Sequence, residues 1–229
     1  MSVNFKDLIN VPNMGANFIK GIDISHHNNT IKDWNSIKNA GMEYVIIKVS
    51  DGVNSPDKYA LEHATMAQKN GLKIGYYHFA HPDSKSGGTI VADAKAEAND
   101  FFGRIKLLPL SELDFFLDLE NWGPAPANDT KLKPSDYLLW VNTFINELMK
   151  VANDPAKSVV IYSRAEYLNS KLPAKHDLGK YKFWLSRYNK DYKKAITPKG
   201  WKDWYLWQFA EDGSFANNMG TFDLNIMRK

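Results

Sequence analysis

The segment FFLDLEN, residues 115–121, holds two carboxylates inside an otherwise apolar run. Asp118 and Glu120 lie two residues apart, and alternate residues of a β-strand point to the same side. Their Cα atoms are then about 6.5–7 Å apart, which corresponds to two strand rises of ~3.3 Å. Because burial of an ionised carboxylate is costly without compensation, this pair needs either a cationic partner or a chemical role.

Two carboxyl groups at this separation raise each other's pKa, and partial burial adds to the effect. One group then keeps its proton near neutral pH while the other is ionised, which is the division of roles that glycoside hydrolysis requires. We expect the longer Glu120 to be the general acid, because it reaches further into a cleft. The alternative is a structural ion pair with Lys48, Arg164 or Arg187. The spacing of the two carboxylates leaves both interpretations open.

The chain around this pair alternates between apolar runs and segments with helical spacing. The expected strands are 21–25, 44–50, 73–79, 113–120, 158–164, 182–188, 204–210 and 221–227. The expected helices are 33–41, 57–71, 89–103, 134–151 and a short one at 166–172. Runs of β-branched residues such as YVIIKVS are typical of buried parallel strands.

Five β/α units are thus followed by three strands with little helix between them. Repeated β/α units favour parallel strands with right-handed crossovers, and eight such strands favour a closed barrel over an open sheet. We therefore predict the α/β class and a single modified β/α barrel over residues 19–229. Residues 1–18 are expected to form an N-terminal leader on the outside of this barrel.

In a β/α barrel, chemistry takes place at the carboxyl ends of the strands. This rule places Asp23 of the first strand and Asp223 of the eighth at the same mouth as Asp118 and Glu120. Four carboxylates from three distant segments could then line one pocket. Their convergence favours a catalytic site.

Composition argues against several other functions. The 29 basic and 26 acidic residues give a net charge of +3 and are scattered, so we expect no nucleic-acid partner. The absence of cysteine excludes disulfides, thiolate metal sites and a cysteine nucleophile. The pairs His26–His27 and His78/His81 match no zinc motif, and no serine-hydrolase, Walker or Rossmann fingerprint occurs, so we expect neither metal nor cofactor.

The sequence also bears on localisation. No apolar run is long enough to cross a membrane, so no membrane insertion is expected. Residues 1–18 are polar and lack a basic start followed by a long apolar core, unlike a secretory signal. We expect a protein made in a host cytoplasm and released by another route.

The chain resembles glycoside hydrolase family 25, the N-acetylmuramidase lysozymes of bacteria and phages. The resemblance extends over residues 19–228 through segments in the family's order: GIDISHHN, IKDW, AGMEYVIIKVSDG, AQKNGLKIGYYHF, FFLDLEN, VVIYSR, FWLSRY, WYLWQF and GTFDLNIM. Three features depart from the family. Asp51 stands where many relatives have glutamate, residues 1–18 have no counterpart, and no wall-binding repeat follows Lys229. We expect either that the barrel alone binds the wall or that this sequence is part of a longer product.

The resemblance implies a phage endolysin-like enzyme that acts on the bacterial cell wall. It would cleave the β-1,4 bond between N-acetylmuramic acid and N-acetylglucosamine in peptidoglycan. Glu120 would be the proton donor, and Asp118 would either stabilise positive charge or orient the substrate's 2-acetamido group. Asp23 and Asp223 would flank the cleft. The expected sugar contacts, which could equally be structural residues of the barrel mouth, are Tyr77, Tyr162, Arg187 and Gln208.

Two other functions have to be weighed against this one. A chitin-type glycosidase can also end a barrel strand in D-x-E, although the full set of segments argues against it. A catalytically inactive barrel could bind glycan only. Such a module has no need for a cluster of carboxylates that repel one another, so the intact cluster argues against it.

Overall fold

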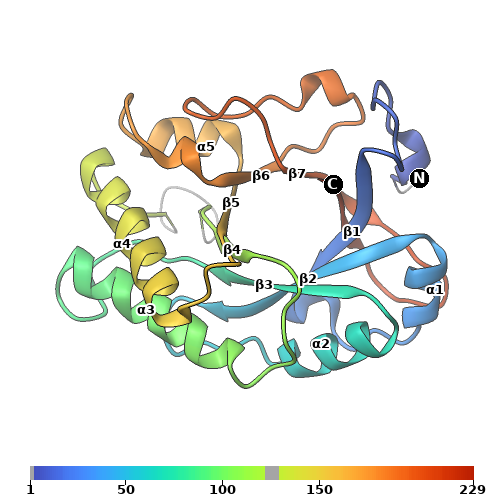
Figure 1. The fold of residues 1–229 in the computed structure, drawn as a ribbon, viewed down its shortest axis with the longest axis horizontal. Helices are drawn as coiled ribbons and strands as arrows, with labels where there is room; N and C mark the ends of the chain where they lie inside the picture. The colour runs from blue at the N-terminus through green and yellow to red at the C-terminus, as the bar shows by residue number, and fades with distance from the viewer. Residues whose placement is uncertain (1–2, 122–128) are drawn as a thin grey trace.

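The computed structural model describes residues 3–121 and 129–229. Its eight strands form one closed barrel in the order of the chain (Figure 1). The strands are β1 (Phe18–Ile24), β2 (Met42–Asp51), β3 (Lys73–Phe79), β4 (Phe115–Asp118), β5 (Val159–Ser163), β6 (Lys182–Ser186), β7 (Leu206–Gly213) and β8 (Phe222–Arg228). The predicted eight-stranded barrel is confirmed.

The barrel is mixed, not fully parallel. Each strand from β1 to β7 pairs in parallel with the next, whereas β8 runs antiparallel to both β7 and β1. Asp23 of β1 and Asp223 of β8 are direct partners in the closing pair of strands. The last strand therefore begins at the end of the barrel where the parallel strands finish.

The helices lie outside the barrel and follow the first five strands (Figure 1). The α-helices are α1 (Trp34–Asn39), α2 (Ala60–Lys69), α3 (Ile90–Ile105), α4 (Pro134–Ala152) and α5 (Ala165–Lys171). The short 3-10 helices are η1 (Phe5–Asp7), η2 (His26–Asn28), η3 (Leu178–Lys180) and η4 (Tyr192–Lys194). No α-helix occurs among the described residues after α5, so the predicted change after five β/α units is confirmed.

Local sequence signals set the ends of these helices. The Asp33 side chain accepts a hydrogen bond from the Ser36 amide at 2.9 Å and so caps α1. Beyond the end of that helix, Gly41 has φ of +87°, a backbone conformation that favours glycine. Thr89 caps α3 in the same manner, through the Ala92 amide at 3.1 Å.

Strand β4 is shorter than predicted. Residues 113–120 were expected to be extended, but the strand runs only from Phe115 to Asp118. Before the strand, the Ser158 amide donates to the side-chain carboxylate of Asp114 at 3.0 Å. This bond takes the place of a backbone hydrogen bond between β4 and the neighbouring segment. After the strand, Leu119 still donates to the carbonyl of Tyr162 at 3.0 Å. Glu120 therefore follows the strand at a position fixed by its neighbour.

Two layers of buried side chains support the barrel. Leu117 and Leu119 belong to the layer between strands and helices, whereas Phe116 packs inside the barrel. Because side chains alternate along a strand, Asp118 points into the barrel interior as Phe116 does. A Cβ at Gly75 would meet the Phe116 ring at 2.8 Å, so this position in β3 leaves room for the interior ring.

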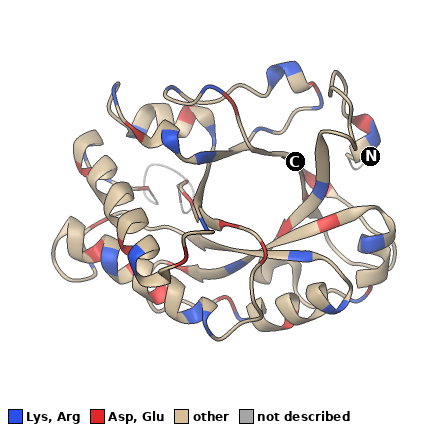
Figure 2. Ribbon diagram, in the orientation of Figure 1, with Lys and Arg blue, Asp and Glu red and all other residues tan. Residues whose placement is uncertain are grey.

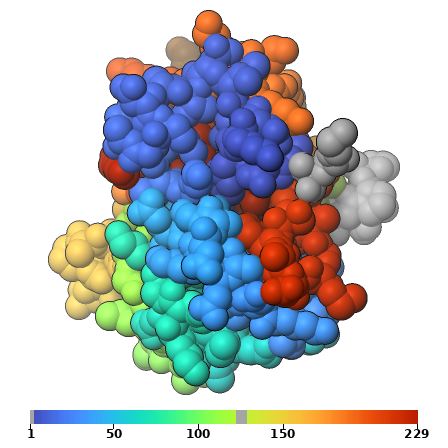
Figure 3. All heavy atoms as spheres, turned by 90° about the vertical axis from the view of Figure 1, so that its right-hand side faces the viewer, coloured from blue at the N-terminus to red at the C-terminus, as the bar shows by residue number. Residues whose placement is uncertain are grey.

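The N-terminal segment, residues 3–17, lies along the outside of the barrel. Phe5 is buried edge-on against Phe209 of β7, with 5.2 Å between ring centroids. The Ile9 amide donates to the Lys190 carbonyl at 2.8 Å, which ties the segment to the loop after β6. Figure 3 shows the first residues in dark blue beside the orange and red C-terminal part of the chain.

Charged residues of both signs are interspersed over the ribbon (Figure 2). This distribution fits the small net charge of +3. Among the described helices, none combines the length and apolar character needed to cross a membrane.

Candidate active site

A cavity of about 230 Å³ opens at the mouth of the barrel and is lined by all four predicted carboxylic residues. We call it the acidic cavity. Asp23 comes from the end of β1, Asp118 from the end of β4, and Glu120 follows directly after β4. Asp223 is the second residue of β8. The structure thus brings together the carboxylates that the sequence predicted to converge.

Asp118 and Asp23 are the two most buried of these groups. The side chain of Asp118 is buried, and within the described part of the chain its Oδ1 atom has no hydrogen-bond partner. A buried oxygen without a partner is unfavourable, since it has lost water and gained no donor in exchange. Asp118 therefore offers an unused acceptor to a group that enters the cavity.

The pKa values of both members of the D-x-E pair are raised. Burial raises the pKa of Asp118 well above its usual value, and the nearby charge of Glu120 adds to the shift. Burial also raises the pKa of Glu120, while the positive charge of Arg164 acts in the opposite direction. The pair accordingly retains a proton at a pH where ordinary carboxylates have lost theirs.

The three cations considered as ion-pair partners are engaged elsewhere. Lys48 contacts Asp51 at 2.5 Å, and Arg187 contacts Glu166 at 3.0 Å. Arg164 donates to the Asn121 side chain at 2.6 Å. The interpretation of the D-x-E pair as a structural ion pair therefore loses its support.

The departure at Asp51 is accommodated by a local ion cluster. Besides Lys48, Asp51 contacts His81 Nε2 at 2.7 Å. The buried Lys48 lines the acidic cavity, and its ammonium also lies over the ring of Phe79, 4.4 Å from the centroid. The shorter Asp51 thus still binds Lys48, which is the one lysine among the described residues that line the acidic cavity.

Asp23 and Asp223 form a second carboxyl pair across the strands that close the barrel. Burial raises the pKa of Asp23 to about 6, against the lowering effect of hydrogen bonds from Gln208 and Asn225. Burial raises the pKa of Asp223 to about 9, and the charge of Asp23 contributes. Near neutral pH the two groups hold one proton, which resides on Asp223.

A buried hydrogen-bond network fixes the orientation of Asp23. Its Oδ2 atom accepts from Gln208 Nε2 at 2.9 Å and from Asn225 Nδ2 at 2.7 Å. The Gln208 carbonyl accepts in turn from Tyr162 at 2.8 Å. On the other side, Trp184 donates to Asn225 Oδ1 at 2.8 Å. Five strands thereby hold this carboxylate in place, namely β1, β5, β6, β7 and β8.

The comparison with known proteins decides which family has this arrangement. A sequence profile of Glycosyl hydrolases family 25 matches residues 22–218, which include three of the four carboxylic residues, Asp23, Asp118 and Glu120. The chain belongs to glycosyl hydrolase family 25.

Two bacterial lysozymes are similar in sequence to this family 25 chain. Lysozyme M1 of Streptomyces globisporus is 29% identical over 208 residues, which cover 90% of this chain and 67% of that protein. The autolytic lysozyme of Clostridium acetobutylicum is 34% identical over 92 residues, 40% of this chain and 25% of that protein.

Solved structures of lysozymes share the fold. The bacterial lysozyme of Streptomyces coelicolor superposes with a TM-score of 0.74 at 27% identity, covering 90% of each chain. A family 25 lysozyme of Aspergillus fumigatus gives a TM-score of 0.73 at 25% identity, covering 93% of this chain and 94% of the other. The predicted family, fold and glycosidase class are confirmed.

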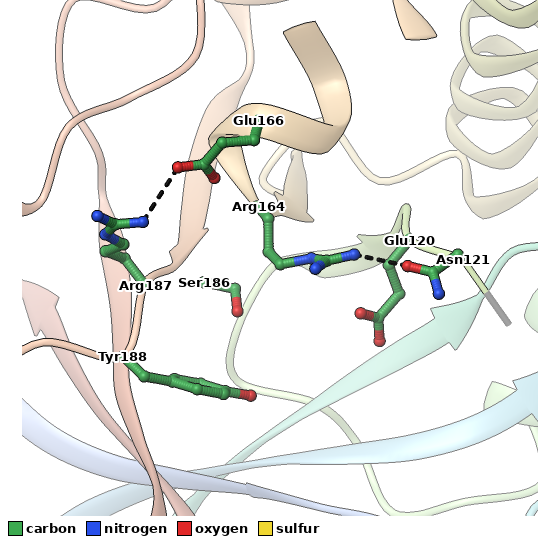
Figure 4. A pocket seen from close by; sticks show the side chains of 7 residues that line it. All are labelled: Glu120, Asn121, Arg164, Glu166, Ser186, Arg187 and Tyr188. Atoms are coloured by element: carbon green, nitrogen blue, oxygen red, sulfur yellow. Dashed lines mark hydrogen bonds and ion pairs between the residues drawn. The ribbon is translucent and has the colours of Figure 1, made fainter. Parts of the chain in front are cut away.

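The predicted sugar contacts of this family 25 enzyme lie in two places. Tyr77, Tyr162 and Gln208 line the acidic cavity. Arg187 lies instead in an adjoining cavity of about 470 Å³, together with Arg164 (Figure 4). We call this second space the arginine cavity. The four residues are therefore near the carboxylic residues of the acidic cavity, and their contacts with sugar stay a prediction.

Sequence reasoning missed some residues of the site. Trp184 and Tyr188 line the acidic cavity but were not among the predicted site residues. Trp184 lies in the middle of β6, where its side-chain direction depends on the register of the barrel. Tyr188 is the second residue after β6, so the rule that chemistry lies at strand ends could have indicated it.

Within the described residues, no group of three or more His, Asp or Glu side chains could hold a metal ion.

Proposed function

We propose that this family 25 muramidase cleaves peptidoglycan with Glu120 as general acid and Asp118 as the partner of the substrate's 2-acetamido group. The bond is the β-1,4 link between N-acetylmuramic acid and N-acetylglucosamine. The observation that carries the proposal is the buried Oδ1 of Asp118, which has no partner among residues 3–121 and 129–229, beside Glu120 in one cavity.

Glu120 suits the acid role by position and by protonation. It is half-buried and lines both the acidic cavity and the arginine cavity, so it lies where a glycan strand passes between them. Burial raises its pKa, which keeps the proton available for the leaving oxygen. Activity should therefore persist to higher pH than for an ordinary glutamate and be lost as pH rises through the raised pKa.

Asp118 suits the acetamido role because its Oδ1 atom needs a donor. An N–H group of the substrate would satisfy it, and that hydrogen bond favours the ionised form of Asp118. The proton of the pair then stays on Glu120. Held in this way, the acetamido oxygen attacks C1 from one face while Glu120 protonates the departing O4 on the other, a known exception to the scheme of two reacting carboxylates.

Asp23 and Asp223 support these groups. With Asp223 protonated and Asp23 fixed by its amide donors, this pair adds a fixed polar wall to the cavity. The side-chain amides of Gln208 and Asn225 both donate to Asp23 inside the protein, so we propose that Gln208 positions Asp23 and contacts sugar only at the edge. Tyr77 and Trp184 provide aromatic surface in the same cavity.

Digestion of purified peptidoglycan tests the reaction. Mass spectrometry of the products should find muramic acid at the new reducing ends. Glucosamine at those ends would favour the chitin-type alternative, and an absence of cleavage would favour a barrel that only binds glycan.

The stereochemistry of the first product tests the role of Asp118. Attack by the acetamido oxygen followed by water retains the β configuration, whereas direct attack by water inverts it. NMR of the anomeric proton in the first minutes of the reaction distinguishes the two. Initial formation of the α-anomer would contradict the proposed role of Asp118 in orienting the acetamido group. The proposed role of Glu120 as general acid would not be affected.

The enzyme acts on the bacterial cell wall. Its synthesis in a host cytoplasm and its release by a route other than a standard signal peptide stay predictions from the composition of residues 1–18.

A further inference from the structure

The arginine cavity is a separate space next to the catalytic groups. Glu120 and Tyr188 line both cavities, so the two are continuous at these residues. Figure 4 shows Arg164 and Arg187 entering the arginine cavity from the ends of β5 and β6, with Tyr188 reaching toward the side where Glu120 lies. The position predicts contact with a part of the substrate close to the scissile bond.

The charges of the two cavities are opposite. The arginine cavity has two guanidinium groups, and Glu166 neutralises one of them through its contact with Arg187 at 3.0 Å. With Glu120 protonated as the acid, one positive charge is left in excess. The acidic cavity holds the carboxyl groups of Asp23 and Asp118 as sources of negative charge, whereas Asp223 keeps its proton, and the single lysine Lys48 is itself paired with Asp51.

An anionic substrate must therefore enter in one orientation. A carboxylate placed among the groups of the acidic cavity would face like charge in a poorly solvated space, which costs free energy. The same carboxylate in the arginine cavity would meet a guanidinium, whose planar set of donors matches a carboxylate in a bidentate contact. Arg164 has five N–H donors, and its bond to Asn121 occupies one of them.

We propose that the arginine cavity binds the free lactyl carboxylate of muramic acid sugars that carry no peptide, with Arg164 as its main contact. This inference rests on the proposed muramidase function and adds a determinant of substrate choice to it. The cavity then distinguishes muramic acid from glucosamine by charge, apart from any contact with the sugar ring.

A matched pair of substrates isolates the charge. Hydrolysis by an amidase breaks the amide between the lactyl group and the peptide, so the peptide leaves and each muramic acid gains a free lactyl carboxylate. Coupling of this carboxylate to methylamine converts it to a neutral amide. The wild-type enzyme should show a KM about 5–20-fold lower for the carboxylate strands, the range expected for one charged hydrogen-bonded contact that is partly screened. High salt should reduce this preference.

Variants at Arg164 connect the preference to the residue. Arg164→Gln should raise KM for the carboxylate strands toward that for the neutral strands, with a smaller change in kcat, and Arg164→Lys should restore part of the preference. Lys69→Gln removes one positive charge from an exposed position at the end of α2 and should leave the preference unchanged. Because Arg164 lowers the pKa of Glu120, rates are compared on the plateau of each variant's pH profile.

Two results would overturn the proposal: equal KM values for both strands in the wild type, or a preference that Arg164→Gln leaves intact. Either result can occur while muramic acid still appears at the new reducing ends, so failure here is distinct from failure of the muramidase assignment.

Discussion

Two buried sets of ionisable groups lie on opposite sides of the barrel wall. On the helix side, His78 of β3 contacts Ser50 Oγ at 2.8 Å and Glu97 Oε2 at 2.6 Å. At the barrel mouth, Asp118 and Glu120 line one cavity, and Asp118 keeps an oxygen without a partner in the described structure. Both sets lose their water, but only the first is compensated by the protein.

This difference separates structural from functional polar groups. On the helix side, Glu97 also accepts from the His81 amide at 3.1 Å, so donors and acceptors are matched. At the mouth, burial and like charges raise pKa values, which destabilises the folded state as the carboxyl groups ionise. The satisfied set holds β2, β3 and α3 together, and the unsatisfied set is available to substrate.

The largest expected effect concerns Glu120, the proposed proton donor at the mouth. Glu120→Gln should lower kcat by about 10²–10⁴-fold, because acid catalysis is lost. The melting temperature should stay the same or rise slightly, since the variant removes a group that burial disfavours. Turnover on peptidoglycan and thermal unfolding are measured on the same preparation. Near-normal turnover would assign the acid to another residue.

A comparable free-energy change is expected on the helix side, but in stability. Glu97→Ala removes the partner of His78 in a fully buried site and should destabilise the fold by about 3–5 kcal/mol. Denaturant unfolding gives this value, and Glu62→Ala on the exposed face of α2 is the control. Activity per folded molecule should be retained. If Glu97→Ala were as stable as the control, the compensated character of this set would be refuted.

A smaller effect of opposite sign is expected at the second carboxyl pair. Asp223 has a pKa raised from 3.8 to about 9, so the folded state binds more protons than the unfolded state between these values. Its contribution to stability is full below about pH 4 and declines as pH rises toward 9.

Asp223→Asn should therefore raise the melting temperature at pH 8 by a few °C and make it decline less steeply as pH rises. For a chain of this size, 1 kcal/mol of stability corresponds to about 2–4 °C in melting temperature. Thermal unfolding between pH 5 and 8 measures both effects. A variant that is less stable than the wild type throughout this range would contradict the raised pKa.

The smallest effect is expected in the network around Asp23. Tyr162→Phe removes the hydroxyl that donates to Gln208, which keeps a longer bond from Ser186 at 3.2 Å. One neutral hydrogen bond contributes about 0.5–1.5 kcal/mol to stability. We expect the variant to lose stability in that range and to have a several-fold lower kcat. Denaturant unfolding and turnover on peptidoglycan measure the two effects. An unchanged kcat would show that Asp23 needs no support from β5.

Periodicity and strand-end positions were sufficient to predict the four carboxylates and the five β/α units. They could not reveal that β8 is antiparallel, because hydrophobic alternation is the same in either direction. Asp223 was assigned to the mouth by a rule for the carboxyl ends of strands, yet it lies at the beginning of β8. Asp223 nevertheless lies at the barrel mouth as predicted, because the antiparallel β8 begins at the mouth.

The arginine cavity was harder to predict than the carboxylates. Arg164 and Arg187 follow different strands, and each is engaged by a residue from another segment, Asn121 and Glu166 respectively. Such pairings depend on how neighbouring strands are staggered, which single-sequence patterns do not specify. The excess positive charge of the cavity appears only when all of these partners are placed.

The reversed last strand also decides how this enzyme can be attached to other materials. Since β8 starts at the catalytic mouth, it delivers Arg228 to the opposite end of the barrel, where Lys229 donates to the Asn17 carbonyl at 3.0 Å. The N-terminal segment returns along the outside, and the Val3 amide reaches Asp212 near the end of β7 at 3.1 Å. A tether placed after Lys229 would present the cleft outward from a surface, whereas one placed before Val3 would crowd the cleft against it.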